Sequence, residues 1–175
     1  MTSPPPIADA HAFFTRTSGE VETVVQGRSM RPAIPDGTTV RVRFGAVADW
    51  APGSIVAFTA QSGWIIHRVV YQGRRGPAAK FMLTRGDNRT LPDGPVARER
   101  VVGLVTAMRV NDDWVPPPAP VPPPLMARLS VGLLGNLLEV SPPLASALSN
   151  GVGVLRGIYV SVRRGVARLL GRGPA

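Results

Sequence analysis

The 175-residue sequence lacks cysteine and contains only one lysine, Lys80, and two histidines, His11 and His67. Without cysteine, the chain cannot form disulfides, cysteine-ligated zinc sites, iron–sulfur clusters or a thiol nucleophile. Two histidines cannot build a three-histidine metal site. We therefore expect no metal and no cofactor, so any catalysis must use serine, carboxylates, arginine, the single lysine or the two histidines.

Long apolar runs are also lacking. Residues 1–6 do not begin with the basic and apolar regions of a secretory leader. No window of about 18 uncharged apolar residues exists, because the nearest one, residues 140–155, is interrupted by two prolines, an asparagine and serines. These absences predict no spanning helix and a cytoplasmic location, with peripheral attachment to a membrane left open.

Glycine and proline are abundant, with 19 residues each, and this composition favours turns and short strands over a helical bundle. The predicted fold class is mainly β: a flexible segment over residues 1–20, then a compact antiparallel β domain over residues 21–115. Alternating apolar residues between turn signals predict the strands, which are 21–26, 38–43, 54–60, 64–71, 80–85 and 101–110.

A proline-rich segment, with seven prolines in residues 116–124, marks the predicted domain boundary, and we expect an extended spacer there. A helical tail is predicted over residues 125–175, since leucines recur every four residues from Leu125 to Leu137 and apolar residues recur every three or four from Leu155 to Leu169. On the second helix, arginines occupy the face opposite the apolar one, so both helices are expected to be amphipathic.

The net charge is +9, and the tail holds a large share of it. Residues 1–115 contain 13 arginines and one lysine against ten acids (+4), whereas residues 116–175 contain six arginines against one acid (+5). With few aromatics, nucleic-acid binding should be weak and not sequence-specific. Residues 152–170 are a candidate for docking on anionic lipid or a protein partner, and packing against the β domain is the alternative.

A serine motif lies between the first two predicted strands. In this Gly-x-Ser-Met-x-Pro string, Gly27 allows close approach of a substrate, Met30 can pack beneath the turn, and Pro32 restricts the backbone so that Ser29 is presented rigidly. A structural turn serine is the alternative interpretation.

The string resembles the nucleophile box of the signal peptidase I superfamily, and the similarity extends over about residues 21–108. An acidic-glycine turn follows at 35–37, then a Pro-Gly pair at 52–53 opening a strand, and then His67 at the head of a basic-apolar stretch, 65–70. Bacterial members use lysine at this point, so the chain is most similar to the endoplasmic-reticulum and archaeal branch. A Gly-Asp-Asn box follows, with Asp87 and then Asp93.

The resemblance implies that Ser29 is the nucleophile, His67 the general base, and one aspartate the group that orients the imidazole. Asp93 is favoured, because Asp87 can instead cap its own turn; a half-buried core histidine is the alternative for His67. The chain departs from the family where Gly27 replaces a small hydroxyl residue that helps to bind the oxyanion. The donors that remain to bind the oxyanion are backbone N–H groups such as that of Ser29.

The predicted function is therefore a serine endopeptidase that cleaves a leader or signal segment from a peptide or precursor protein. The first alternative is a non-catalytic module of the same fold that binds a peptide or partner. The second is a protein that binds nucleic acid or anionic membranes weakly. A self-cleaving repressor is not favoured, because only 28 residues precede Ser29.

Overall fold

A computed structural model describes residues 19–44, 50–60 and 63–151 of the chain. The predicted N-terminal segment 1–20 lies outside these residues except for its last two, which begin the first strand. His11 and the predicted basic helix with its docking region, residues 152–170, also lie outside them.

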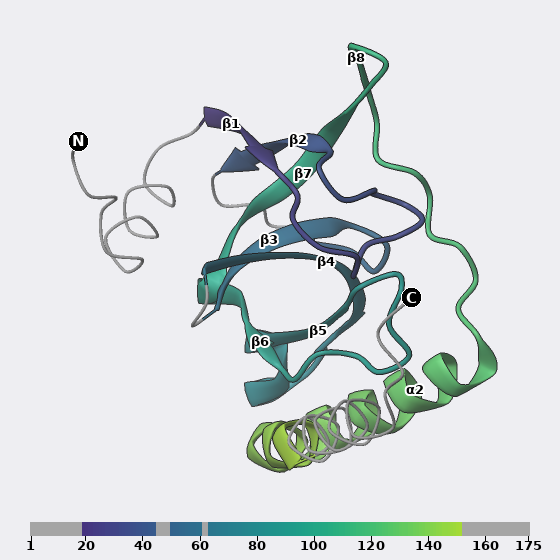
Figure 1. Cartoon of the computed structure of the whole chain (residues 1–175). Coiled ribbons are helices and arrows are strands. Elements are labelled where there is room, and N and C mark those ends of the chain that lie inside the picture. The colour runs from purple at the N-terminus through teal and green to yellow at the C-terminus, as the bar shows by residue number, and fades with distance from the viewer. Residues whose placement is uncertain (1–18, 45–49, 61–62, 152–175) are drawn as a thin grey trace, which may run out of the picture.

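The described part of the chain is built around one antiparallel sheet of eight strands (Figure 1). The strand order is β1-β2-β7-β3-β4-β5-β6, and β8 pairs with β7. The strand β7 thus lies between the pair β1–β2 and the group β3–β6. The strands are β1 Gly19–Val24, β2 Thr39–Phe44, β3 Ile55–Ala60, β4 Gly63–Gln72, β5 Phe81–Arg85, β6 Val96–Ala97, β7 Val101–Val110 and β8 Asp113–Val115.

The mainly β prediction is confirmed, and each of the six predicted strands ends within two residues of an observed one. The short strands β6 and β8 were not predicted. The prediction that Lys80 opens a strand is wrong: Lys80 ends a 3₁₀ turn, η1 (Gly76–Lys80), in which a proline lies in the first turn, and the strand starts at Phe81. A second such turn, η2 (Arg98–Arg100), precedes β7.

Alternation of side chains divides the sheet into two apolar clusters. On β3, Ile55 and Ala57 join one cluster, whereas Val56 and Phe58 join the other. Both faces of this strand are therefore buried, as expected for a strand inside a strongly curved sheet. The first cluster also contains Met30, which is 1% exposed and anchors the turn that carries the serine motif.

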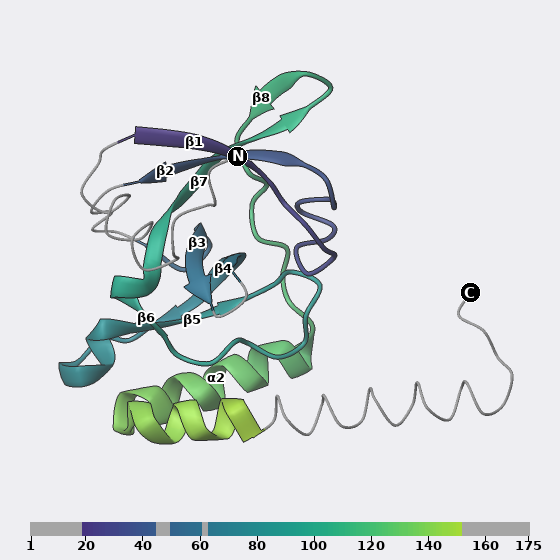
Figure 2. The ribbon, with the colours of Figure 1, turned by 60° about the vertical axis from the view of Figure 1, so that its left-hand side comes forward.

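Two C-terminal helices lie beneath the sheet (Figure 2). The helix α2 (Leu125–Val140) begins directly after the last proline of the proline-rich segment, and a second helix begins at residue 142 and is described as far as residue 151. Prolines at 142 and 143 separate the two, because proline is tolerated at the start of a helix but not in its interior. A third apolar cluster joins α2 to the sheet through Leu134 and Leu138, which pack with Leu83.

The leucines of the repeat that predicts α2 do not form the helix face that packs on the sheet. Leu125, Leu129 and Leu133 are exposed, and only Leu137 of the repeat packs against the third cluster. The buried residues of the helix are instead Ala127, Leu134, Gly135 and Leu138. The helix therefore has one apolar face against the sheet and another apolar face on the surface.

The proline-rich segment 116–124 forms no helix or strand and runs against the sheet. The Arg68 guanidinium donates to the backbone oxygen of Pro118 (3.3 Å), and Pro120 lies beside Gly53. These contacts connect the segment to the turn before β3. Among the described residues, no helix has the length and apolar character needed to cross a membrane.

Candidate active site

Three separate parts of the chain bring Ser29, His67 and Asp93 together. Ser29 lies in the turn between β1 and β2, His67 lies in the middle of β4, and Asp93 lies in the loop between β5 and β6. The His67 Nε2 atom is 3.0 Å from Ser29 Oγ, and His67 Nδ1 is 2.5 Å from Asp93 Oδ2. The three side chains form one continuous hydrogen-bonded chain.

Further contacts hold Asp93 and His67 in this arrangement. The Thr84 hydroxyl donates to Asp93 Oδ2 (2.8 Å), and the Asp93 N–H donates to the Thr84 backbone oxygen (2.7 Å). Thr84 is fully buried, and His67 is only 4% exposed, with the Phe58 ring edge-on to its imidazole. The imidazole orientation is thus fixed by packing as well as by the carboxylate.

The serine turn is rigid for reasons visible in its sequence. Met30 and Ile34 are buried in the first apolar cluster, and the Ile34 N–H donates to the Met30 backbone oxygen (2.9 Å). Gly27 has a φ of +95°, which favours glycine, and its N–H donates to Asp36 Oδ1 (2.8 Å). Pro32 is exposed on the surface of the turn, so Met30, and not Pro32, ties the motif to the core.

The Gly-Asp-Asn box packs directly on the serine turn, a contact that sequence reasoning did not predict. The Asn88 N–H donates to the Ser29 backbone oxygen (2.8 Å), and the Asn88 side-chain amide donates to the Arg28 backbone oxygen (3.2 Å). A Cβ atom at Gly86 would lie 2.6 Å from the Ser29 oxygen and 3.0 Å from His67 Nε2. Only glycine leaves room here, so Gly86 and Asn88 position the nucleophile.

Asp87 is placed apart from the histidine. Its carboxylate accepts hydrogen bonds from Arg68 Nε (3.0 Å) and Nη2 (2.8 Å), and the two side chains are 14% and 4% exposed. The Arg68 Nη1 atom also donates to the Gly53 backbone oxygen (2.8 Å). Of the two candidate aspartates, Asp93 contacts His67, whereas Asp87 holds Arg68 and does not cap its own turn.

A cleft of about 260 Å³ opens beside Ser29 and His67. One wall is made by residues 23–26 at the end of β1, and the other by residues 64–66 on β4, with Arg89 contributing a positive charge. Val24, at 52% exposed, presents an apolar side chain to solvent at this wall. Both walls come from extended backbone segments, β1 with the residues that follow it and β4, an arrangement that suits a peptide in the β conformation.

The backbone N–H of Ser29 is a hydrogen-bond donor at the site. In the part of the chain that the structure describes, the Ser29 N–H has no hydrogen-bond acceptor. Gly27 has no side chain that could assist it. Within residues 19–44, 50–60 and 63–151, no group of three His, Cys, Asp or Glu residues is arranged to hold a metal ion.

In comparisons with known proteins, the chain matches no family model and no curated protein sequence at a significant level.

Proposed function

We propose that the protein is a serine endopeptidase in which Ser29 is the nucleophile, His67 the general base and Asp93 the orienting carboxylate. The observation that carries this proposal is the chain of hydrogen bonds from Ser29 Oγ through the imidazole to Asp93, at 3.0 Å and 2.5 Å. A nucleophile, its base and a group that orients the base define this type of site by geometry.

The reaction follows from these positions. As Ser29 Oγ attacks the peptide carbonyl carbon, His67 Nε2 takes the hydroxyl proton, and the Ser29 N–H stabilises the oxyanion. The imidazolium then gives that proton to the leaving amine, which departs and leaves an acyl-enzyme. A water molecule, deprotonated by His67, attacks the acyl carbon, and the proton returns to Ser29 Oγ as the carboxylic product leaves.

Asp93 determines which imidazole nitrogen is available. By accepting a hydrogen bond from the Nδ1–H, the carboxylate keeps Nε2 unprotonated and directed at Ser29 Oγ. It also stabilises the imidazolium that forms during attack. Because Thr84 holds the same Asp93 oxygen, the carboxylate is positioned before substrate arrives.

The substrate in this proposal is a leader or signal segment of a precursor protein, bound in an extended conformation along the cleft. Two observations support it: the cleft lies between two extended segments next to Ser29, and residues 21–108 resemble the signal peptidase I superfamily. The signal-peptidase type of fold, and cleavage after small residues, come from that resemblance.

The test is cleavage of a peptide library derived from a whole proteome, with products identified by mass spectrometry. Ser29→Ala and His67→Ala should each lower cleavage by about a million-fold, below detection, because either change removes the nucleophile and base as a unit. Ser146→Ala is the matched control, since this serine lies in the helix described over residues 142–151, and it should leave cleavage unchanged.

Two results would contradict the proposal. Cleavage that survives both Ser29→Ala and His67→Ala would show that the activity belongs to a contaminant or another site. Retention of peptides without cleavage by the wild-type protein would instead indicate the non-catalytic peptide-binding module.

A further inference from the structure

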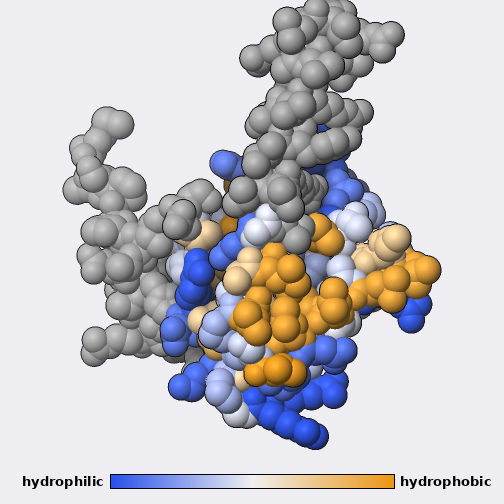
Figure 3. All heavy atoms as spheres, turned by 90° about the horizontal axis from the view of Figure 1, so that it is seen from below, coloured by the Kyte–Doolittle hydropathy of each residue, from blue (hydrophilic) through white to orange (hydrophobic). Residues whose placement is uncertain are grey.

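The exposed apolar face of α2 is a feature that the proposed reaction does not use. We call it the leucine stripe and define it as the exposed apolar residues of α2 and of the helix that follows. Figure 3 shows apolar side chains gathered on this underside of the molecule. Its members are Leu125, Met126, Leu129, Leu133, Val140, Leu144 and Leu148.

The stripe is too exposed and too continuous to be ordinary surface. Leu125, Met126, Leu129 and Leu133 are between 59% and 69% exposed. Their spacing of three and four residues places them on one side of the helix, one turn apart. Contiguous exposed apolar surface of this kind marks an interaction site in a native protein, whereas scattered single residues do not.

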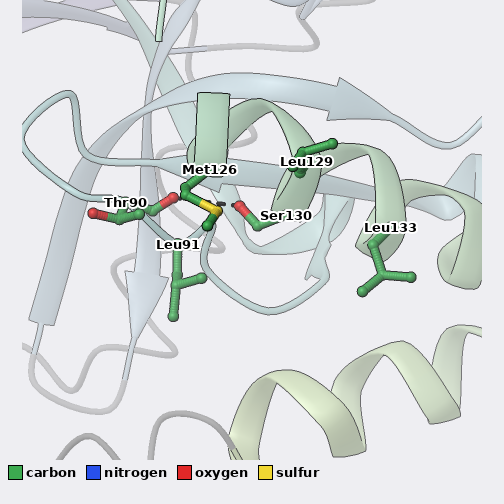
Figure 4. A pocket seen from close by; sticks show the side chains of 6 residues that line it. All are labelled: Thr90, Leu91, Met126, Leu129, Ser130 and Leu133. Atoms are coloured by element: carbon green, nitrogen blue, oxygen red, sulfur yellow. Dashed lines mark hydrogen bonds between the residues drawn. The ribbon is translucent and has the colours of Figure 1, made fainter. Parts of the chain in front are cut away.

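The stripe extends onto the loop that carries Asp93. Leu91 and Thr90 face Met126 and Leu129 across a hollow of about 580 Å³ (Figure 4). The Ser130 hydroxyl, which also borders this hollow, is 3.3 Å from the Thr90 backbone oxygen. The apolar surface is therefore attached to the segment between Asp87 and Asp93.

The charge around the stripe indicates what it contacts. Residues 116–151 contain only two charged side chains, Arg128 and Glu139. The Glu139 carboxylate accepts hydrogen bonds from the Tyr71 hydroxyl and the Arg74 N–H, so it faces the sheet and not the stripe. Arg128 is exposed on α2. The exposed side of the helices thus presents apolar and cationic groups without an acid.

The chain continues from this helix into residues 152–175, which contain five arginines and no acidic residue. An apolar helical face next to a purely cationic segment is the composition of segments that bind the surface of anionic membranes. A second copy of the chain would carry the same net positive charge, +5 over residues 116–175, so charge complementarity favours an anionic lipid surface over a second copy.

We propose that the leucine stripe is a membrane-binding surface, which inserts its apolar side chains into the headgroup region of a lipid bilayer, and that the positive charge of Arg128 and of the five arginines in the sequence after residue 151 makes it prefer anionic lipid. The axis of α2 would lie parallel to the bilayer surface, and the helix would not cross the bilayer. Because Thr90 and Leu91 border the stripe, the loop that carries Asp93 would lie next to the lipid surface.

The first test is co-sedimentation of the full-length protein with phosphatidylcholine vesicles, with and without phosphatidylglycerol. Wild type should sediment with the anionic vesicles. The double variant Leu129→Asn with Leu133→Asn should bind about tenfold more weakly or worse, because two apolar side chains lose their burial in lipid. Val110→Asn, an exposed apolar position on β7, is the matched control and should bind like wild type.

The second test uses the absence of cysteine, which permits labelling at a single introduced site. Leu133→Cys carrying an environment-sensitive fluorophore should shift its emission to shorter wavelength when anionic vesicles are added, whereas labelled Val110→Cys should not. This measurement does not depend on the double variant's remaining folded.

Three outcomes would overturn the proposal. One is the absence of binding to anionic vesicles. Another is binding that the two leucine changes leave intact, which would assign it to the arginines alone. The third is wild-type self-association in sedimentation velocity that the leucine changes abolish, without lipid binding; this would make the stripe an interface between copies of the chain.

Discussion

Asp87 and Asp93, six positions apart in one loop, have different partners and should have different effects when they are changed. Asp93 accepts from the imidazole, whereas Asp87 accepts from a buried guanidinium. Asp93 therefore belongs to the candidate catalytic group, whereas Asp87 belongs to a buried ion pair that supports the fold around it.

Asp93→Asn should lower kcat about ten-thousand-fold while the protein stays folded. The amide retains the size of the carboxylate but stabilises the wrong imidazole tautomer, so that Nε2 no longer accepts the Ser29 proton. Cleavage kinetics together with the thermal unfolding midpoint check this. A variant with normal kcat would show that His67 does not depend on Asp93.

Asp87→Ala should act mainly on stability. It leaves the buried Arg68 without its carboxylate, and breaking a buried ion pair from one side costs about 3–5 kcal/mol. Urea unfolding measures the loss. The double variant Arg68→Met with Asp87→Leu is the control and should be more stable than Asp87→Ala, because it removes both charges. Equal stability of the two variants would contradict this view of the pair.

How far the site could be predicted differs between residues. Ser29, His67 and Asp93 were predicted through the resemblance of their motifs and order to the signal peptidase I superfamily, and the structure brings them together. The positioning contacts of Gly86 and Asn88 were not predicted, although the Gly-Asp-Asn box was visible. Their contact with the serine turn joins residues almost sixty positions apart and leaves no periodic signal.

At the scale of the element, α2 is attached to the sheet by a polar contact as well as by apolar packing. The Tyr71 hydroxyl donates to Glu139 Oε1 (2.8 Å), and the Arg74 N–H donates to the same oxygen. These hydrogen bonds hold the pKa of Glu139 below its ordinary value of 4.5. Burial and the neighbouring Glu139 raise the pKa of Tyr71 above 10.0. The charged carboxylate and the neutral phenol are therefore the favoured forms in the folded protein.

This pair predicts a pH dependence of stability. The pKa of Glu139 is lower in the folded protein than in the unfolded chain. Its contribution to the stability of the fold is therefore fully present above pH 4.5 and is lost as the pH falls through the lowered pKa. The difference in unfolding free energy between wild type and Glu139→Gln should therefore shrink in acid. Tyr71→Phe, which removes the donor, should show the same trend. A difference that grows in acid would contradict the assignment.

Elements were predicted best where the pattern repeats. Alternation over six or more residues located most of the strands, but β6 and β8, of two and three residues, are too short to show it. The leucine repeat from Leu125 to Leu137 predicted a helix after the prolines, yet it could not show which face packs. That face depends on Leu134 and Leu138 meeting Leu83, a tertiary contact.

At the scale of the whole molecule, the question is whether the helices unfold with the sheet. Leu138 is fully buried in the third apolar cluster together with Leu83 of β5. The proline-rich segment is also held by Arg68. From these contacts we expect the described helices and the sheet to unfold together, whereas the composition shift at residues 116–124 predicts a boundary between them.

Leu138→Ala should therefore destabilise the whole molecule by about 2–5 kcal/mol. All three tryptophans, Trp50, Trp64 and Trp114, precede the prolines, so their fluorescence reports on the sheet, while far-UV circular dichroism reports on the helices. Both signals should follow one unfolding curve, and both should shift in the variant. Loss of helix before the change in fluorescence would instead establish two separate units.

The position of β7 has a consequence for the order of events during synthesis. Ser29 follows β1, and His67 lies on β4, but in the sheet these two parts of the chain are joined through β7, the last of the long strands to be made. A nascent chain that ends before Val101 contains all three candidate catalytic residues and yet lacks the strand that brings them into register. The proposed site is therefore completed only after β7 has been synthesised and has paired with β2 and β3, and no shorter nascent chain holds it in the folded arrangement.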